Sequence, residues 1–273
     1  MTRIFRHFYG AALALAVIVP PLEAEEAAYA GLDPIAKGKA IAETAEARDS
    51  GFHDSTAELK MILRNKRGQE SVRELRIMTL EEPASDTGDK SMVVFDRPRD
   101  VKGTALLTHS NILDEDNQWL LMPAINRVKR ISSRNKSGSF MGSEFSYEDM
   151  AAPEVEKYHY VWLRDEACAA LTCHVVERTP AYEYSGYTKT VVWIDTEAYR
   201  LQRTDFYDRR GDHFKTLTLS DYRLYLDKHW RAHALEMVNH KSGKSTSLSW
   251  SNMAFKTGLD KRDFTQAALK RKR

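Results

Sequence analysis

The feature that most constrains the fold of this chain is a long series of short segments rich in β-branched and aromatic residues. These segments follow one another from residue 56 to residue 255, with charged turns or clusters of Gly, Pro, Asn and Asp between them. Such segments predict β-strands, and consecutive strands joined by short turns favour an antiparallel meander over βαβ units. The predicted strands are 56–65, 71–81, 91–96, 102–109, 118–123, 128–132, 157–165, 173–178, 189–195, 201–208, 213–226, 230–239 and 245–255.

Hydrophobic alternation predicts how the faces of this sheet are covered. In residues 59–64 and 72–77, apolar and charged side chains alternate, so one face of these strands is expected to contact water. Residues 92–95, 120–122 and 191–194 are apolar without alternation. These three segments are therefore predicted to be covered on both faces.

One N-terminal helix is predicted ahead of the strands. Residues 33–49 are rich in alanine, with apolar side chains spaced among charges, and Asp33 followed by Pro34 is a typical helix start. This helix is the obvious cover for the second face of the sheet. Because no Pro-rich or Gly-rich linker and no solenoid repeat divides the chain, residues 25–273 are predicted to form a single, mainly β domain.

The first residues predict export from the cytoplasm. Arg3 and Arg6 precede an apolar run at 11–19, and small residues follow at the end of 1–24 and again at 28–30, which is the layout of a secretory signal peptide. The apolar run has about half of the roughly 20 residues that a membrane-spanning helix needs. We therefore predict a signal peptide over 1–24, with cleavage as late as residue 30 as the variant, and a soluble periplasmic protein.

Two cysteines, Cys168 and Cys173, lie five positions apart on either side of a turn-like segment. In an oxidising compartment this spacing is compatible with a disulfide across the end of a hairpin. It is equally compatible with two buried thiols, because the Cα geometry that a disulfide needs cannot be derived from sequence.

Composition and motifs argue against nucleic-acid binding and against catalysis. The 41 basic and 39 acidic side chains leave a net charge of +2, too small for a typical nucleic-acid binder. Ser133 and Lys136 have the S-x-x-K spacing of acyl-transfer enzymes, but lie in a basic loop rather than at the start of a buried helix. His229 and His233 lie in a segment that alternates like a strand, which favours surface histidines over a metal site. We predict that the protein is not an enzyme and has no cofactor or metal.

The most informative segment lies between residues 95 and 150, where a basic loop is followed by large apolar side chains. Phe140 and Phe145 come directly after a flexible run of Ser and Gly. A basic loop ending in apolar side chains suits an amphiphile with an anionic head group, or a membrane surface. The alternative is a solvated loop whose two Phe residues fill the core of the sheet. The cations of this basic loop are Arg127, Lys129, Arg130, Arg134 and Lys136.

The same region resembles the periplasmic outer membrane lipoprotein-sorting protein family, in the branch that has the LolA-like fold. Weaker similarity extends from the N-terminal helix to about residue 255. The resemblance implies an unclosed antiparallel β-barrel, with an N-terminal helix and a short helical lid over the concave face. The matching segments are 95–100 (FDRPRD), 103–107 (GTALL), 119–123 (WLLMP), 127–131 (RVKRI) and 139–149 (SFMGSEFSYED).

The resemblance also implies a function. The concave face would receive lipoprotein acyl chains or another lipid, and the protein would pass this group towards the outer membrane, with a membrane lipid exporter as a partner. The alternative is a periplasmic adaptor that docks to a membrane transporter without carrying lipid. Transient contact with a membrane fits both functions. The residues predicted to line the hydrophobic cavity are Leu107, Trp119, Leu121, Phe140, Phe145, Trp162 and Trp193.

Overall fold

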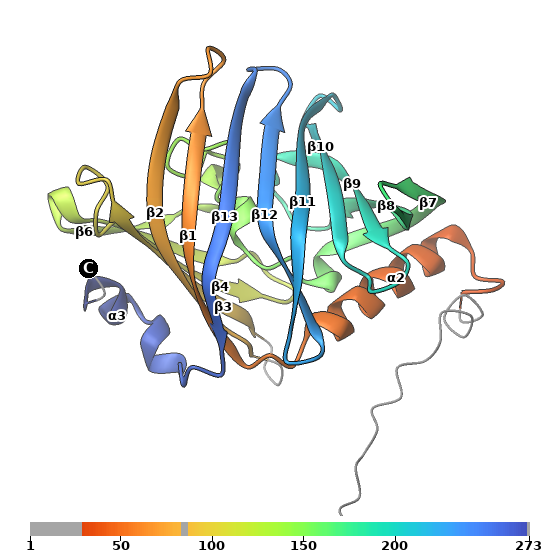
Figure 1. Ribbon diagram of the computed structural model, residues 1–273, viewed down its shortest axis with the longest axis horizontal. Coiled ribbons are helices and arrows are strands. Elements are labelled where there is room, and N and C mark those ends of the chain that lie inside the picture. The colour runs from red at the N-terminus through yellow and green to blue at the C-terminus, as the bar shows by residue number, and fades with distance from the viewer. Residues whose placement is uncertain (1–28, 83–86, 272–273) are drawn as a thin grey trace, which may run out of the picture. The chain divides into compact units, whose positions relative to one another are not determined.

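The computed structural model describes residues 29–82 and 87–271, and the compact unit that begins at Leu32 contains one curved sheet with helices α2 and α3 (Figure 1). Thirteen antiparallel strands pair in the order β6-β5-β4-β3-β2-β1-β13-β12-β11-β10-β9-β8-β7. Strands β6 and β7 are therefore the two edge strands, and the sheet does not close. The prediction of a mainly β, unclosed antiparallel fold is confirmed.

Each predicted strand corresponds to one observed strand, and no strand end differs from its prediction by more than four residues. The predicted signal peptide at 1–24 lies outside the described residues. Among the described residues, no helix combines the length and the apolar character needed to cross a lipid bilayer. The observed strands are β1 (Asp54–Arg64), β2 (Glu70–Leu80), β3 (Thr87–Arg97), β4 (Ala105–Asn111), β5 (Asn117–Met122), β6 (Arg127–Ile131), β7 (Tyr158–Cys168), β8 (Leu171–Pro180), β9 (Tyr187–Asp195), β10 (Leu201–Asp208), β11 (His213–Tyr225), β12 (His229–Asn239) and β13 (Lys244–Phe255).

Helix α2 (Pro34–Asp49) begins where the sequence predicts because Asp33 caps it. The Asp33 carboxylate accepts hydrogen bonds of 2.9 Å from the backbone N–H groups of Ile35 and Ala36, two donors that have no partner within a helix. Ile41 is fully buried on the face that meets the sheet. The helix packs mainly along the edge strand β7 and also contacts β8 and β12.

The contact between α2 and β7 depends on a glycine. A Cβ atom at Gly38 would lie 2.6 Å from the backbone nitrogen of Trp162, so the helix approaches the strand backbone more closely than any side chain allows. Beside this contact, the Lys37 ammonium lies 3.7 Å from the centre of the Trp162 ring, a cation–π geometry. This close approach holds α2 against one edge of the sheet.

The concave face of the sheet is largely filled by the segment between β6 and β7, residues 132–157, here called the plug. Its Phe140 and Phe145 are buried and cluster with side chains that include Leu106 of β4 and Met237 of β12. Because β4 and β12 are far apart in the strand order, both can reach the same rings only if the sheet curves around the plug. Figure 1 shows this arrangement, with the green plug inside the curved sheet.

The convex face of β2 to β5 is covered at the other end of the chain. Met92, Leu107 and Leu121 cluster there with Phe264 and Leu269, and Leu269 belongs to the short helix α3 (Gln266–Arg271). The prediction that the N-terminal helix is the cover for the doubly apolar strands was therefore wrong for this region. A second cover is needed because α2 packs against β7 at the far edge of the sheet.

The hairpin between β7 and β8 is closed by a disulfide between Cys168 and Cys173. Strand β7 ends at Cys168, and Ala169 in the turn has a left-handed backbone conformation with φ of 54°. Of the two alternatives left open by the sequence, the structure therefore has the disulfide.

Substitution Gly38→Ala is expected to destabilise the protein by about 1–3 kcal/mol, because the added methyl group overpacks against the strand backbone. This loss has to exceed the gain of up to about 1 kcal/mol that alanine brings to a helix interior. The free energy of unfolding in urea measures the effect. Lys39→Ala, at an exposed neighbouring position, should change it by less than about 0.5 kcal/mol; an equal loss in both variants would contradict the close contact.

Candidate functional site

Two cavities open on the concave side of the sheet, near opposite ends of the strands. The helix cavity lies between α2 and the strands β8 to β12, and its lining includes Lys228 in the β11–β12 turn. The hairpin pocket lies between the plug and the turns β10–β11 and β12–β13, and its lining includes Arg210 and Lys244. Successive turns of an antiparallel meander alternate between the two ends of the sheet, which places the two cavities at different ends.

The helix cavity has a volume of about 580 Å³ and walls that are more apolar than polar. Ala42 and Ala45 of α2 form one side. Val176 of β8 and Val192 and Ile194 of β9 form the opposite side. The volume falls within the roughly 300–1,000 Å³ that is usual for small-molecule sites. Five aromatic residues also line the cavity, namely Phe52, Tyr160, Tyr199, Tyr222 and Trp230.

Two arginines that line the helix cavity are held against these aromatic rings. The Arg200 guanidinium lies 4.8 Å from the centre of the Trp230 ring, and its Nε donates a hydrogen bond of 2.8 Å to Asp195. The Arg231 guanidinium lies 5.0 Å from the centre of the Phe52 ring. Because cation–π contacts fix the charged heads, the long side chains add apolar surface to the cavity.

A group of carboxylates lies where α2, the plug and the start of β3 meet. Burial, and then the charge of Asp89, raises the pKa of Glu154 to about 7, while Lys157 opposes the shift and Glu46 adds to it. Burial raises the pKa of Asp89 to about 6. A Cβ atom at Gly88 would overlap the Glu154 carboxylate, so this group is seated directly on the β3 backbone. Asp89 of β3 and Glu154 of the plug therefore titrate near neutral pH, and burial also raises the pKa of Glu46 of α2 beside them.

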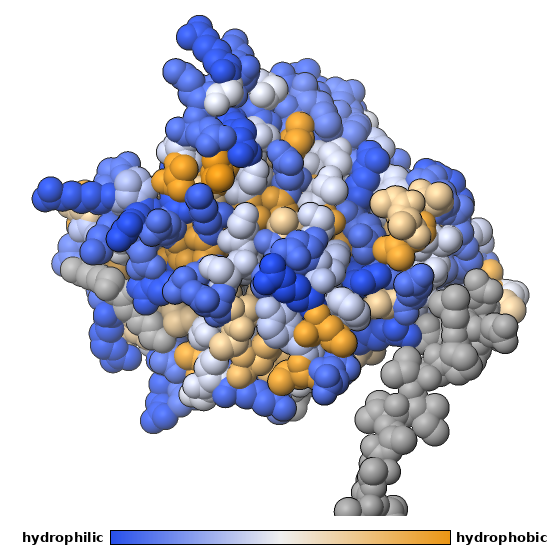
Figure 2. Space-filling view, in the orientation of Figure 1, coloured by the Kyte–Doolittle hydropathy of each residue, from blue (hydrophilic) through white to orange (hydrophobic). Residues whose placement is uncertain are grey.

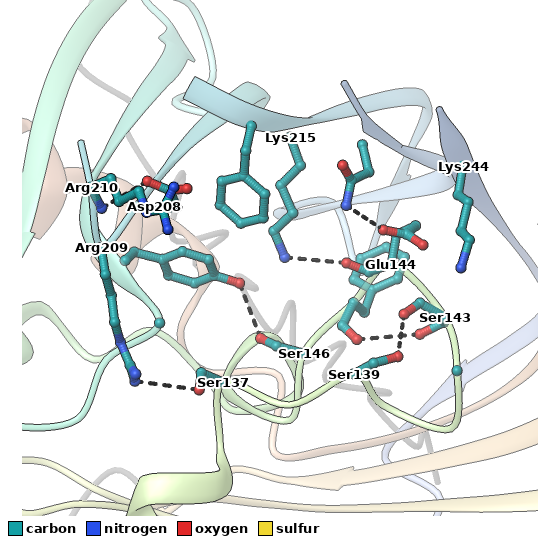
Figure 3. Close-up of a pocket in the computed structure, with 16 residues that line it drawn as sticks. Ser137, Ser139, Ser143, Glu144, Ser146, Asp208, Arg209, Arg210, Lys215 and Lys244 are labelled. Carbon is teal, nitrogen blue, oxygen red and sulfur yellow. Dashed lines mark hydrogen bonds between the residues drawn. The ribbon is translucent and has the colours of Figure 1, made fainter. Parts of the chain in front are cut away.

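The hairpin pocket is different in chemistry, with a volume of about 590 Å³ and many hydroxyl and charged groups (Figure 3). Its plug side carries Ser137, Ser139, Ser143 and Ser146. Ser139 and Ser143 donate hydrogen bonds to carbonyl groups of the plug itself. These bonds hold the segment SFMGSEF in a compact loop at the side of the pocket.

Lys215 holds the base of the hairpin pocket together. Its side chain is only 3% exposed, and Nζ lies 2.7 Å from Oδ2 of Asp149. The same carboxylate accepts hydrogen bonds of 2.7 Å from the Tyr187 hydroxyl and from the backbone N–H of Ser146. Burial raises the pKa of Tyr187 well above its ordinary value, so its hydroxyl stays protonated. This network ties the plug to β9 and β11.

The structure separates the residues that the sequence predicts to line one cavity. Three lie beneath α3 on the convex face, and Trp193 lies on the convex face of β9, where its Nε1 donates to Glu166. Trp162 lies against α2, Phe140 is fully buried in the plug core, and Phe145 lines the hairpin pocket. The three beneath α3 are Leu107, Trp119 and Leu121.

The sequence reasoning missed the lining of the helix cavity because it could not assign faces to β9. All four residues at 191–194 are apolar, so alternation does not say which side chains point inward. Register settles the question: Val192 pairs with Val176 of β8, and both line the cavity, whereas Trp193 pairs with Val175 on the other face.

The cations of the predicted basic loop do not act as one surface. Arg127, Lys129 and Arg130 lie on the edge strand β6, where charged side chains discourage pairing with other chains. Lys136 is buried, which lowers its pKa, and Arg134 lies over the Tyr184 ring.

The histidines that the sequence predicts at the surface are buried. His229 and His233 are each 3% exposed; they contact the Asp49 carbonyl and the Tyr225 hydroxyl, respectively. Within residues 29–82 and 87–271, no group of three or more His, Cys, Asp or Glu side chains is arranged to hold a metal ion.

Comparisons with known proteins identify close relatives among solved structures. A family model described as an uncharacterized protein matches residues 87–271. A Vibrio parahaemolyticus domain described as an outer membrane lipoprotein-sorting protein has 50% identity and a TM-score of 0.83, over 86% of this chain and 98% of that chain. A DUF1329 family protein from Desulfovibrio piger has 29% identity and a TM-score of 0.82, over 87% and 100%.

A LolA superfamily protein from Nitrosomonas europaea shares the fold, with 20% identity and a TM-score of 0.69 over 85% of this chain and 98% of that chain. No curated protein matches the chain.

The raised pKa values predict that the protein is more stable at mildly acidic pH. A carboxyl group that titrates near 4.5 when unfolded and near 7 when folded stabilises the protein below pH 4.5, and this contribution is lost as the pH rises to 7. Glu154→Gln should therefore raise the free energy of unfolding at pH 8 by roughly 1 kcal/mol, after allowing for solvent screening of this half-buried group.

Urea unfolding of the wild type and of Glu154→Gln between pH 4.5 and 8 measures this effect, with Glu43→Gln on the exposed side of α2 as the control. The slope of stability against pH should flatten in Glu154→Gln alone. Parallel curves for all three proteins would show that Glu154 does not titrate in this range.

Proposed function

The chain belongs to the outer membrane lipoprotein-sorting protein family with the LolA-like fold, and from this premise we propose that it carries a hydrophobic group through the periplasm. The cargo is an acyl chain of a lipoprotein or another lipid, and the protein passes it towards the outer membrane. No chemical step is part of this function.

The observation that carries the proposal is the helix cavity. A carrier must bury several methylene groups together, because each contributes only about 0.8 kcal/mol. A cavity of about 580 Å³ between α2 and the apolar faces of β8 and β9 offers that surface without any rearrangement of the core. Its cover is one helix that packs mainly on an edge strand, so cargo can enter and leave if α2 moves slightly.

The lining residues predicted from the sequence remain part of this proposal. Phe140 and Phe145 belong to the core cluster on the concave face, so we expect a long acyl chain to meet them only if it extends beyond the helix cavity. For the other predicted lining residues, contact with cargo in a rearranged form of the protein stays a prediction. These residues are Leu107, Trp119, Leu121, Trp162 and Trp193.

The adaptor function is the second candidate, and the edge strand β6 favours it. Arg127, Lys129 and Arg130 present three cations on an edge strand, a surface suited to an acidic segment of a transporter. A membrane lipid exporter as partner fits either function.

Filling the helix cavity should weaken binding of an apolar probe. Ala45→Phe places a ring in the cavity, whereas Ala47→Phe adds the same ring at an exposed position of the same helix. We expect N-phenyl-1-naphthylamine, a neutral fluorescent probe, to bind Ala45→Phe about tenfold more weakly, a loss of about 1.4 kcal/mol. Equal affinity in both variants would show that the probe binds elsewhere.

Native mass spectrometry of protein purified from a membrane-containing lysate separates the two functions. A carrier should retain phospholipid or fatty acid, and Ala45→Phe should lose it while Ala47→Phe keeps it. Lipid-free wild-type protein that still binds a transporter would support the adaptor and contradict carriage.

A further inference from the structure

The hairpin pocket has an excess of positive charge that the proposed cargo does not explain. Four cations and two carboxylates line it. Lys215 is paired with Asp149, Asp208 is paired with Lys241, and the Glu144 carboxylate accepts a hydrogen bond from the Asn239 amide. The four lining cations are Arg209, Arg210, Lys215 and Lys244.

These pairings leave three cations without a carboxylate and one carboxylate, Glu144, whose charge the neutral Asn239 amide does not cancel, so the pocket keeps a net positive charge. Within residues 29–82 and 87–271, no ion pair involves Arg209, Arg210 or Lys244. The neighbouring ion pairs are those of Lys215 and Lys241. The charge of the three cations without a carboxylate is therefore available to a ligand. All three are exposed residues of the pocket lining, so solvent screens part of their field.

Arg209 is held in position by the loops around it. Its Nε donates to the Ser185 carbonyl at 3.1 Å, and its Nη2 lies 3.4 Å from the Tyr184 carbonyl and from the Ser137 hydroxyl. Among the residues that the structure describes, none bonds to Nη1. A guanidinium fixed on one side and free on the other is preorganised for an oxyanion, since little side-chain freedom is lost on binding.

The pocket also has an aromatic side. Phe145 of the plug and Phe214 and Tyr187 of the sheet line it, and Figure 3 shows Lys215 between the groups of cations, directed at the plug. The buried Lys215 ammonium lies 4.9 Å from the centre of the Tyr187 ring and 5.7 Å from that of Phe214. An anionic group bound here would therefore lie next to an apolar surface.

We propose that the hairpin pocket binds a phosphoryl group, held by Arg209 and Arg210 on one side of the pocket, with Lys244 on the other side adding to the attraction and any apolar part of the ligand against Phe145 and Phe214. Several cations around one pocket suit a phosphoryl group, whose oxygens accept more than one charge-assisted hydrogen bond. The hairpin pocket and the helix cavity lie at different ends of the sheet, so this binding does not depend on the proposed carrier function.

The ligand chemistry has two sources, a free phosphate and the head group of a lipid, and calorimetry with matched probes distinguishes them. The probes are inorganic phosphate, dihexanoyl phosphatidic acid and dihexanoyl phosphatidylcholine, whose head group carries a compensating positive charge. We expect the wild-type protein to bind phosphate or phosphatidic acid, and to bind phosphatidylcholine at least about tenfold more weakly than phosphatidic acid. If phosphatidic acid binds more than about tenfold tighter than phosphate, the source is an amphiphile; equal binding identifies a free anion.

The triple variant R209Q/R210Q/K244Q should bind the preferred anion at least about tenfold more weakly than the wild type. The matched control R127Q/K129Q/R130Q removes the same charge from the edge strand β6 and should bind as the wild type does. Arg209→Lys keeps the charge but loses the forked geometry of the guanidinium. Its affinity for the anion should lie between those of the triple variant and the β6 control. Thermal unfolding confirms that each variant is folded.

Two results would overturn the proposal. The first is that the wild-type protein binds neither phosphate nor phosphatidic acid. An equal loss of affinity in the pocket variant and the β6 control is the other, because it would show attraction by overall charge. Binding of N-phenyl-1-naphthylamine is measured on the same variants; it should be unchanged, so a failure of the carrier function is seen separately.

Discussion

An antiparallel sheet that does not close must cover its apolar faces with other parts of the chain, and this constraint organises the whole protein. The middle strands are apolar on both sides, as Met92 to Phe95 of β3 show by their complete burial. Each face therefore needs its own cover. The concave face receives the plug, the convex face receives α3, and the far edge receives α2.

The covers differ in how completely they fill the space beneath them. Phe140 and Phe145 of the plug are buried in the concave core, and Leu269 of α3 is buried on the convex face. Helix α2 does not, because Gly38 brings one end of it against the β7 backbone while Ala42 and Ala45 leave a cavity farther along. The cavity arises where the cover has small side chains, and two carboxylates with raised pKa values, Asp89 and Glu154, line its margin.

Much of the fold could be predicted from the sequence, because alternation and turn residues are local signals. Every strand was predicted, and the Asp33 cap marked the start of α2 within one residue. Helix α3 was missed because its six residues are too short to show a helical period. The cavity was missed for a different reason: whether Val192 or Trp193 points inward depends on the register with β8, which no property of residues 191–194 reveals. Whether Cys168 and Cys173 form a disulfide could not be decided from the sequence, because the answer depends on the distance between their Cα atoms.

The proposed function depends on a cavity beneath α2 that apolar cargo can enter. A crystal structure of the protein with a bromine-labelled fatty acid tests it most directly, because bromine is located by its anomalous scattering without assumptions about the chain. We expect a bromine peak between Ala45 of α2 and Val192 of β9. Peaks confined to the outer surface or to the region beneath α3, with the space under α2 closed by its own side chains, would contradict it.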